Sequence, residues 1–320
     1  MGAGLGMMGH VGWAKESSGG VAVAAATYIE ALSEGFVRTQ DRLEVTNIGG
    51  RLSRPDTYRG ANHVAGDLSF AVDPVTFGSF LQAAFGPGTR TDVLSGSFWT
   101  HTYKPPTSSA WDDRFAAQPY TFEIFRDVGS SQQYAGCNLN TMNLIAAFNQ
   151  ELRAETNWIG IAESDIAKTS PTFVSDPVDP FGFDTASISI AGAASAIVEG
   201  FTIGINNNLE GFGTLRNSRD IYKIRRTDFV TPTIEMTIGF ENITDYLRFK
   251  NETEVAVVAN FFRAGSFGLA IDLPRVIYTA HPTGVSGRGR QTVQIAGEVR
   301  YHTGSSAAME VRLNTNVASF

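Results

Sequence analysis

A strand that runs into a helix is predicted over residues 64–85 by the spacing of the apolar side chains. Apolar residues at alternate positions have the period of a strand with one buried face: Leu68, Phe70 and Val72. Asp73 and Pro74 suit a helix start, because an aspartate oxygen accepts free backbone N–H groups and proline fits the first turn. Gly86-Pro87-Gly88 ends the predicted helix. Its apolar stripe consists of Phe77, Phe80, Leu81, Ala84 and Phe85.

The same pattern returns 166 residues later along the chain, counted from Phe77 to Ile243. The second strand pattern comprises Ile234, Met236 and Ile238, and the second helix pattern comprises Ile243, Tyr246 and Leu247. Identities at the same offset are Leu43-Glu44 with Leu209-Glu210, Arg59 with Arg225, and Val64 with Val230. A strand and a helix repeated at one ungapped offset indicate a duplicated module.

The composition indicates a globular protein built mainly from strands. Its 320 residues suffice for two domains of ordinary size, and 42% hydrophobic with 18% charged residues exclude a disordered chain. The 33 glycines and 22 phenylalanines, with few long helical patterns, favour many short strands joined by tight turns. A formal net charge of −7 argues against a nucleic-acid binder held by phosphate contacts.

These patterns predict a mainly β fold of two tandem β-sandwich or barrel-like modules, each with one flanking α-helix. The expected parts are an N-terminal arm and first strand (1–35), a first module (36–168), a linker (169–185) and a second module (186–320). The linker is assigned because its prolines and aspartates resist both helix and central strand. Further strands are expected over 97–103, 120–126, 133–144, 152–161, 254–262, 267–273, 276–280, 291–301 and 308–313.

Residues that could carry catalysis or bind a metal form no recognisable site in the sequence. No two of the five histidines have metal-ligand spacing on a short element, and His101 is interpreted as a strand-face residue. The single cysteine, Cys137, excludes an internal disulfide and is interpreted as a buried thiol. The linker carboxylates Asp176, Asp179 and Asp184 fit a solvated segment better than a calcium site. We therefore expect no enzyme activity, no cofactor and no metal.

No membrane partner is expected either. No apolar run approaches the about 18 residues of a transmembrane helix. The first residues lack the basic segment and long apolar core of a secretory signal. We therefore expect the chain to fold in the cytoplasm of the cell that produces it.

Several stretches, in their order along nearly the whole chain, resemble the major tail tube proteins of long-tailed, siphovirus-type bacteriophages. In the first half they are Trp13-Ala14-Lys15-Glu16, Val64-Ala65-Gly66-Asp67-Leu68-Ser69-Phe70, Phe80-Leu81-Gln82-Ala83-Ala84-Phe85-Gly86, Thr100-His101-Thr102-Tyr103 and Tyr134-Ala135-Gly136-Cys137-Asn138-Leu139-Asn140. In the second half they are Asn207-Asn208-Leu209-Glu210 and Leu273-Pro274-Arg275-Val276.

The resemblance implies a virion tail protein whose inner strands join those of its neighbours into a continuous barrel. Stacked rings of such subunits surround a channel for the genome, and a chain with two modules needs three copies where one-module members need six. The implied assembly is therefore a homotrimeric, pseudo-hexameric ring, put together in the host cytoplasm. The implied partners are the tape measure protein and genomic DNA in the channel, and the tail terminator and baseplate proteins at the ends.

Two other classes of protein stay open at this point. One is a different ring component of the tail, such as a terminator or baseplate protein. The other is a β-sandwich carbohydrate-binding module or enzyme, which needs an aromatic platform or a carboxylate pair. The tryptophans, scattered along the sequence, do not indicate such a platform: Trp13, Trp99, Trp111 and Trp158.

Two basic stretches at equivalent places in the repeat are candidate contacts between subunits or rings, or else solvated loops. They contain Arg51, Arg54 and Arg59 in the first half, and Arg216, Arg219, Lys223, Arg225 and Arg226 in the second. Acidic residues that could face them in a neighbouring copy are Glu16, Glu30, Glu34, Glu163 and Asp165. The channel wall itself is expected to carry little positive charge, because each basic contact would hold DNA.

Overall fold

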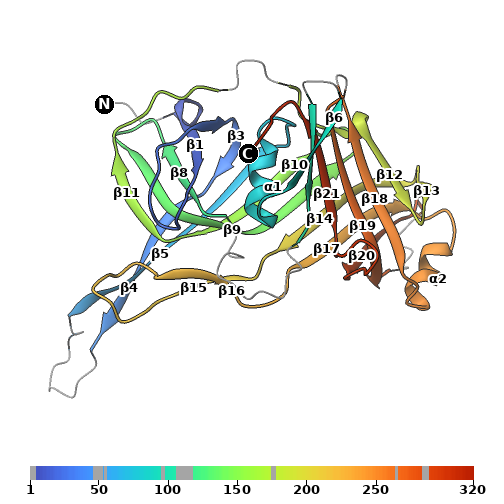
Figure 1. The fold of residues 1–320 in the computed structure, drawn as a ribbon. Coiled ribbons are helices and arrows are strands. Elements are labelled where there is room, and N and C mark those ends of the chain that lie inside the picture. The colour runs from blue at the N-terminus through green and yellow to red at the C-terminus, as the bar shows by residue number, and fades with distance from the viewer. Residues whose placement is uncertain are drawn as a thin grey trace.

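The computed structural model describes residues 5–45, 53, 56–94, 98–105, 118–173, 178–263, 266–282 and 288–320. Curved antiparallel sheets enclose a core, with helix α1 (Phe77–Phe85) inside the molecule and helix α2 (Thr244–Lys250) at one end (Figure 1). Two hairpins project together from the opposite end. The mainly β fold predicted from the sequence is confirmed.

The strands account for most of the described chain. In the first half they are β1 (His10–Lys15), β2 (Thr27–Ile29), β3 (Ala31–Glu34), β4 (Val37–Glu44), β5 (Thr57–Ala71), β6 (Thr89–Leu94), β7 (Phe98–Tyr103), β8 (Tyr120–Phe125), β9 (Ser131–Ala147), β10 (Arg153–Gly160) and β11 (Ala162–Ile166). In the second half they are β12 (Ala186–Ile190), β13 (Ala193–Ala194), β14 (Val198–Asn206), β15 (Leu209–Phe212), β16 (Lys223–Arg226), β17 (Thr231–Gly239), β18 (Val255–Phe262), β19 (Gly268–Ala280), β20 (Thr292–Val299) and β21 (Glu310–Thr315). Short 3-10 helices lie at Gly6–Met8 and Phe183–Thr185.

The strand and helix predicted over residues 64–85 are present as β5 and α1. Alternate residues of β5 are buried, and every apolar residue of the predicted stripe on α1 is buried. Asp73 caps a turn ahead of the helix, since its Oδ1 accepts the backbone N–H groups of Val75 and Thr76, both at 2.8 Å. The helix therefore begins at Phe77 rather than at Pro74. The repeat of this pattern is present as β17 and α2.

The strands of the two halves pair in corresponding orders. In the first half the antiparallel order is β4–β5–β10–β9–β8–β1–β2. In the second half it is β14–β17–β20–β19–β18–β12–β13. In each half the helix follows the second strand of this order, and a further strand pairs with the start of the long strand, β11 with β9 and β21 with β19.

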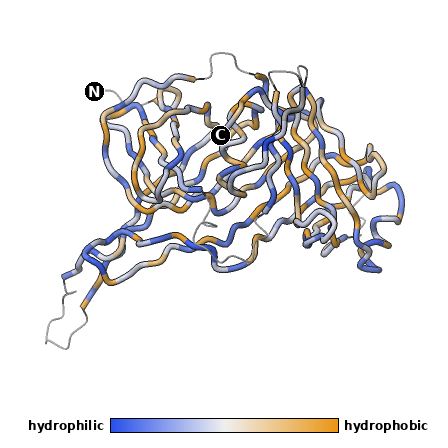
Figure 2. The backbone as a smooth tube through the Cα atoms, viewed as in Figure 1, coloured by the Kyte–Doolittle hydropathy of each residue, from blue (hydrophilic) through white to orange (hydrophobic). Residues whose placement is uncertain are grey.

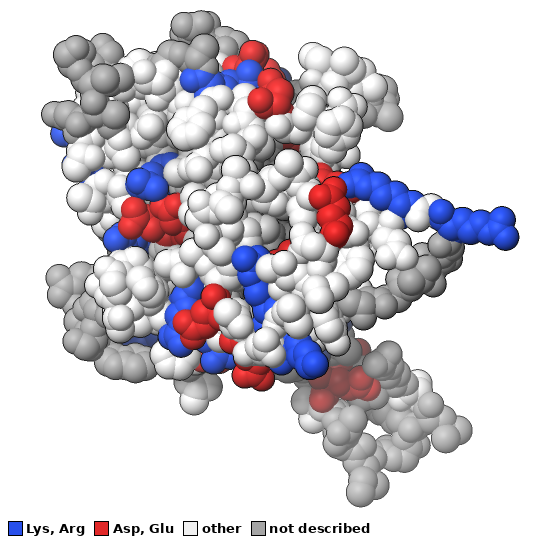
Figure 3. Space-filling model, turned by 90° about the vertical axis from the view of Figure 1, so that its right-hand side faces the viewer, with Lys and Arg blue, Asp and Glu red and all other residues white. Residues whose placement is uncertain are grey.

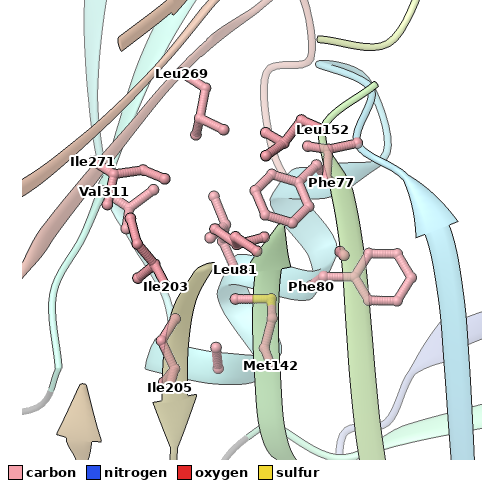
Figure 4. Close-up of a cluster of buried hydrophobic side chains, with 14 of the residues drawn as sticks. Phe77, Phe80, Leu81, Met142, Leu152, Ile203, Ile205, Leu269, Ile271 and Val311 are labelled. Carbon is pink, nitrogen blue, oxygen red and sulfur yellow. The ribbon is translucent and has the colours of Figure 1, made fainter. Parts of the chain in front are cut away.

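One hydrophobic core runs through both halves. The end of β9, from Thr141 to Ala147, pairs with β14 from Asn206 back to Gly200, and β7 pairs with β21. Around α1, side chains of the two halves point toward one another (Figure 4). The labelled residues are Phe77, Phe80, Leu81, Met142 and Leu152 from the first half, and Ile203, Ile205, Leu269, Ile271 and Val311 from the second.

Two segments differ from the sequence-based expectation. The start of the chain contributes a central buried strand, β1, which pairs with both β2 and β8 and inserts Trp13 into the core. The expected solvated linker is anchored at Phe181, a fully buried side chain whose backbone N–H donates to the carbonyl of Val72 at 2.9 Å. Both differences have one cause, since a large aromatic side chain gains free energy by leaving water.

Candidate functional site

A long continuous run of strands gives the molecule one outward polar face. The run is β4–β5–β10–β9–β14–β17–β20–β19, and its inner face packs on the core. On its outer face one row of neighbouring residues crosses the strands in register: Ser69, Glu155, Asn143, Gly204, Thr233 and Glu298. Hydroxyl, amide and carboxylate groups therefore dominate this face.

The central part of the outward face is acidic. Over residues 65–71, 141–147, 153–159, 200–206, 231–237 and 292–298 the outward carboxylates are Asp67, Glu155, Glu235 and Glu298. Arg153 is the one lysine or arginine in these same described ranges, and its Nη2 lies 2.8 Å from Oε1 of Glu155. A polyanion that slides along this face meets no row of cations there.

The run of strands ends in unpaired edges on both sides. At one end β3 and β4 pair with β5 alone, and within the described residues no strand covers their other edge. At the other end, residues 277–280 of β19 pair only with β20, among the strands that the structure describes. The matching part of β9 is instead held between β10 and β14. Unpaired strand edges are ready templates for another chain.

The basic candidates that the structure describes lie on the two hairpins that project together in Figure 1, β4–β5 and β15–β16. Leu43 and Glu44 pair with the start of β5, as Leu209 and Glu210 pair with β16. Hydrophilic segments dominate both hairpins in Figure 2. The base of β15–β16 packs through Leu209, Ile221 and Ile224 on Ile159 and Ile161 of the first half.

The structure gives the basic candidates unlike environments. Arg51 and Arg54 lie outside the described residues. Arg59 stands opposite Arg42 across the β4–β5 hairpin, and Arg225 stands opposite Glu210 across β15–β16. Lys223 is in the same β16 strand, opposite Phe212.

Arg216 and Arg226 make hydrogen bonds within their own chain. The Nη2 of Arg216 donates to the carbonyls of Asp220 at 3.0 Å and Ile221 at 2.8 Å. Arg226 donates to the carbonyl and to the side-chain oxygen of Asn207, both at 3.0 Å, and burial lowers its pKa. These two side chains shape the hairpin, whereas Arg219 contributes a backbone carbonyl that binds the N–H of Asn62 at 2.9 Å.

Some of the acidic residues expected to face a neighbouring copy bind partners within their own chain. Glu16 is buried, where its carboxylate accepts the N–H groups of Gly136 at 2.7 Å and Gly20 at 2.8 Å. Glu34 pairs with Arg126 at 2.7 Å, and Glu163 lies 3.9 Å from Arg38. An outward role for Glu16 is wrong, because backbone donors around the left-handed Gly136 claim its oxygens.

The side chains considered for chemistry are structural. Cys137 is buried, and burial raises the pKa of its thiol well above the usual value. His101 lies on strand β7, as predicted, where its Nε2 is 2.8 Å from the carbonyl oxygen of Val317 and burial lowers its pKa. In the part of the chain that the structure describes, no cluster of histidine, cysteine and carboxylate side chains could hold a metal ion. The helices found there are too short or too polar to cross a membrane.

A mainly β architecture with a continuous sheet, open edges and a polar outward face suits a subunit that pairs its strands with those of neighbouring copies. The chain matches the model of the phage tail tube protein family over residues 8–301, and it belongs to that family. A search of curated proteins found no match. The protein is therefore a structural component of a bacteriophage virion tail that self-assembles into a tube, as the resemblance indicated.

The sequence had pointed to the basic stretches and missed the sheet edges. Strand pairing between distant segments leaves no periodic signal, so which edges stay open could not be read from the sequence. The signal available in the sequence was the repeat itself. When two repeated units pair edge to edge within one chain, the outer edges of the pair are left for other copies.

Proposed function

We propose that this chain is the major tail tube subunit, built from two copies of one module and assembled in the host cytoplasm. The modules are 36–168 and 186–320, preceded by the arm and first strand and joined by the segment 169–185. The observation that carries the proposal is the common order of strand pairing in the two halves, together with the seam between β9 and β14. In this proposal the two halves are like modules that pair side by side in one sheet, as two neighbours in a ring would.

Three copies close the ring in this proposal. The seam between β9 and β14 leaves one open edge at β3–β4 and another at the end of β19. The edge at β3–β4 corresponds to β14 of the second half, and the end of β19 corresponds to the end of β9 in the first half. A head-to-tail contact of two different edges generates a closed ring when the rotation per copy is right. Six module positions then require three chains.

The outward polar face lines the channel. Its acidic and hydroxyl groups suit a duct for DNA, because a wall with few cations offers the phosphates few binding sites. The same channel holds the tape measure protein before the genome passes. Terminator and baseplate proteins bind at the two ends of the tube, where the last rings leave their contacts unfilled.

The paired hairpins make the contacts between rings. They extend beyond the body of the subunit, and both faces of β4 are exposed along most of its length. Apolar residues are exposed there as well: Leu43 at 58%, Tyr58 at 61% and Leu215 at 109%. Arg59 and Arg219 add positive charge beside them. Exposed ion pairs contribute only about 0–1 kcal/mol each, so the apolar residues supply most of the stacking free energy.

Negative-stain electron microscopy of the purified chain tests the proposal. Long hollow tubes with three copies per ring are expected, with the copy number measured by native mass spectrometry of isolated rings. Single rings that never stack indicate a terminator or baseplate component instead. Monomers under all assembly conditions, or six chains per ring, contradict the proposal.

A further inference from the structure

Helices α1 and α2 lie at corresponding positions of the repeat, but their apolar side chains differ strongly in burial. Phe77 and Leu81 on α1 have 0% of their surface exposed. At the corresponding positions, Ile243 directly before α2 and Leu247 on it are exposed by 59% and 41%. Both helices present an apolar stripe, but only α1 has it covered.

First-half strands β7 and β9 cover part of α1, and the second half of the chain completes the cover. Asn207, just after β14, donates from its Nδ2 to the carbonyl of Ala84 at 3.1 Å. The ring of Phe320 lies so close to α1 that a Cβ added at Gly78 would stand 2.1 Å from it. Leu81 points toward Ile203 of β14 in Figure 4. The second half therefore seats α1 at the same seam where β14 pairs with β9.

Among the described residues, the corresponding seat over α2 is open. The helix lies at the far end of the molecule, beside the end of β19 (Figure 1). Figure 3 views this end of the molecule, where basic and acidic side chains are interspersed with wide uncharged areas. No strong field of one sign would keep a like copy away.

His281 supports a missing neighbour at this place. It directly follows β19 and is 5% exposed among the rings of Phe240, Tyr246 and Phe249. Neither ring nitrogen has a hydrogen-bond partner among the described residues. Buried polar groups in finished structures are nearly always hydrogen-bonded, so an unpartnered one beside an open edge indicates an incomplete site.

We propose that the apolar face of α2 is the seat for a second copy of this chain, which covers it with β3, β4 and the adjoining core strands of its first half. The proposal rests on the proposed function, since it assigns the contact that closes the ring. Within the chain, α1 is covered beside β14. Strands β3 and β4 pair with β5 in the first half as β14 pairs with β17 in the second half. Leu32 and Val37 on these edge strands are 55% and 50% exposed, an apolar surface that α2 can bury.

Cysteine labelling measures this contact directly. In the variant Leu247→Cys the new thiol is on the exposed helix face, while the native Cys137 is buried and does not react. Maleimide should label the new cysteine at least about tenfold more slowly in assembled tubes than in free subunits. The matched control is Val128→Cys, a position with 58% exposure in the turn between β8 and β9, which should react alike in both states.

A charge variant supplies a second measurement. Leu247→Glu should leave the circular dichroism spectrum and unfolding midpoint of the free subunit unchanged, because the residue is exposed, and should prevent ring closure. Val128→Glu should assemble normally. If Leu247→Cys in tubes stays as reactive as in the subunit, or Leu247→Glu still forms rings, this inference is overturned while the proposed function stands. If the unmodified chain never assembles, both are overturned.

Discussion

Asn62 on β5 donates a hydrogen bond from its Nδ2 to Oδ1 of Asp220 in the β15–β16 connection, at 2.7 Å. Its backbone N–H also donates to the carbonyl of Arg219, at 2.9 Å. These bonds join a strand of the first half to a loop of the second, more than 150 residues apart in the chain. The two projecting hairpins are thereby tied into one unit, which suits a shared contact with the next ring.

The double variant Arg59→Glu and Arg219→Glu should slow or abolish tube formation without unfolding the subunit. Arg59 faces Arg42 across its hairpin, so a glutamate at this position replaces a repulsive pair by an attractive one. Light scattering during assembly measures the rate at several salt concentrations. The control is Arg59→Lys with Arg219→Lys, which keeps the charge and should assemble nearly normally. Unchanged assembly of the glutamate variant at every salt concentration would leave these hairpins as solvated loops.

Glu16→Ala should destabilise the subunit by about 1–3 kcal/mol, because the buried N–H of Gly136 and the hydroxyl of Thr121 lose their acceptor. The Thr121 Oγ1 lies 2.6 Å from Oε1 of Glu16. Urea unfolding followed by tryptophan fluorescence measures the free energy of unfolding. Glu163→Ala is the matched control, since this partly exposed carboxylate lies 3.9 Å from Arg38 and should change stability by less than about 1 kcal/mol. Equal effects of the two variants would contradict the assigned role of Glu16.

Glu123 should make the stability of the subunit fall in acid. Burial raises the pKa of its carboxyl, but hydrogen bonds from Thr169 and His10 outweigh burial, so the pKa lies below its ordinary value of 4.5. A lowered pKa in the folded state means that the charged form stabilises the fold. This contribution is fully present above pH 4.5 and is lost as the pH falls through the folded-state pKa.

The variant Glu123→Gln isolates that contribution. At neutral pH its free energy of unfolding should be lower than that of the unmodified chain by about 1–3 kcal/mol. The difference should shrink as urea titrations are repeated from pH 7 toward pH 3. A gap that stays constant over this range would show that ionisation of Glu123 does not contribute.

Cations placed on the outward face should make the tube retain DNA. Thr202 and Thr233 lie on adjacent strands of that face, in β14 and β17. Tubes of the double variant Thr202→Lys and Thr233→Lys should bind double-stranded DNA with an affinity that falls as salt rises, because lysines release counterions from phosphates. Tubes of the unmodified chain and of the Thr202→Gln and Thr233→Gln control should not. Equal DNA binding by all three would contradict a channel lined by this face.

Local pattern predicted much of the fold. The alternation of Leu68 and Phe70 predicted β5, and the stripe from Phe77 to Phe85 predicted α1, because one buried face imposes its period on neighbouring residues. The same reasoning expected a strand within residues 1–35 but did not place it at β1, where Trp13 is flanked by small residues in a segment too short to show a period. It also assigned Glu16 to the surface, since only the fold reveals the backbone donors that require a buried acceptor.

The assembly surfaces were predictable only in part. The basic side chains were visible in the sequence, but their ties to Asp220 and Asn207 depend on contacts between distant segments. Nothing in the sequence distinguished Leu81 from Leu247, two leucines at the same place in the repeat. The second half of the chain completes the cover over Leu81, whereas no described segment covers Leu247 in the same way.

The covalent continuity from β9 to β14 changes how the proposed ring would form. A contact within one chain needs no encounter, so its stability does not vary with protein concentration, whereas contacts between copies follow mass action. In a ring of three such chains, every second seam would already exist when the chain has folded. Nucleation of the tube would then be a third-order rather than a sixth-order event, and dilution would slow it correspondingly less.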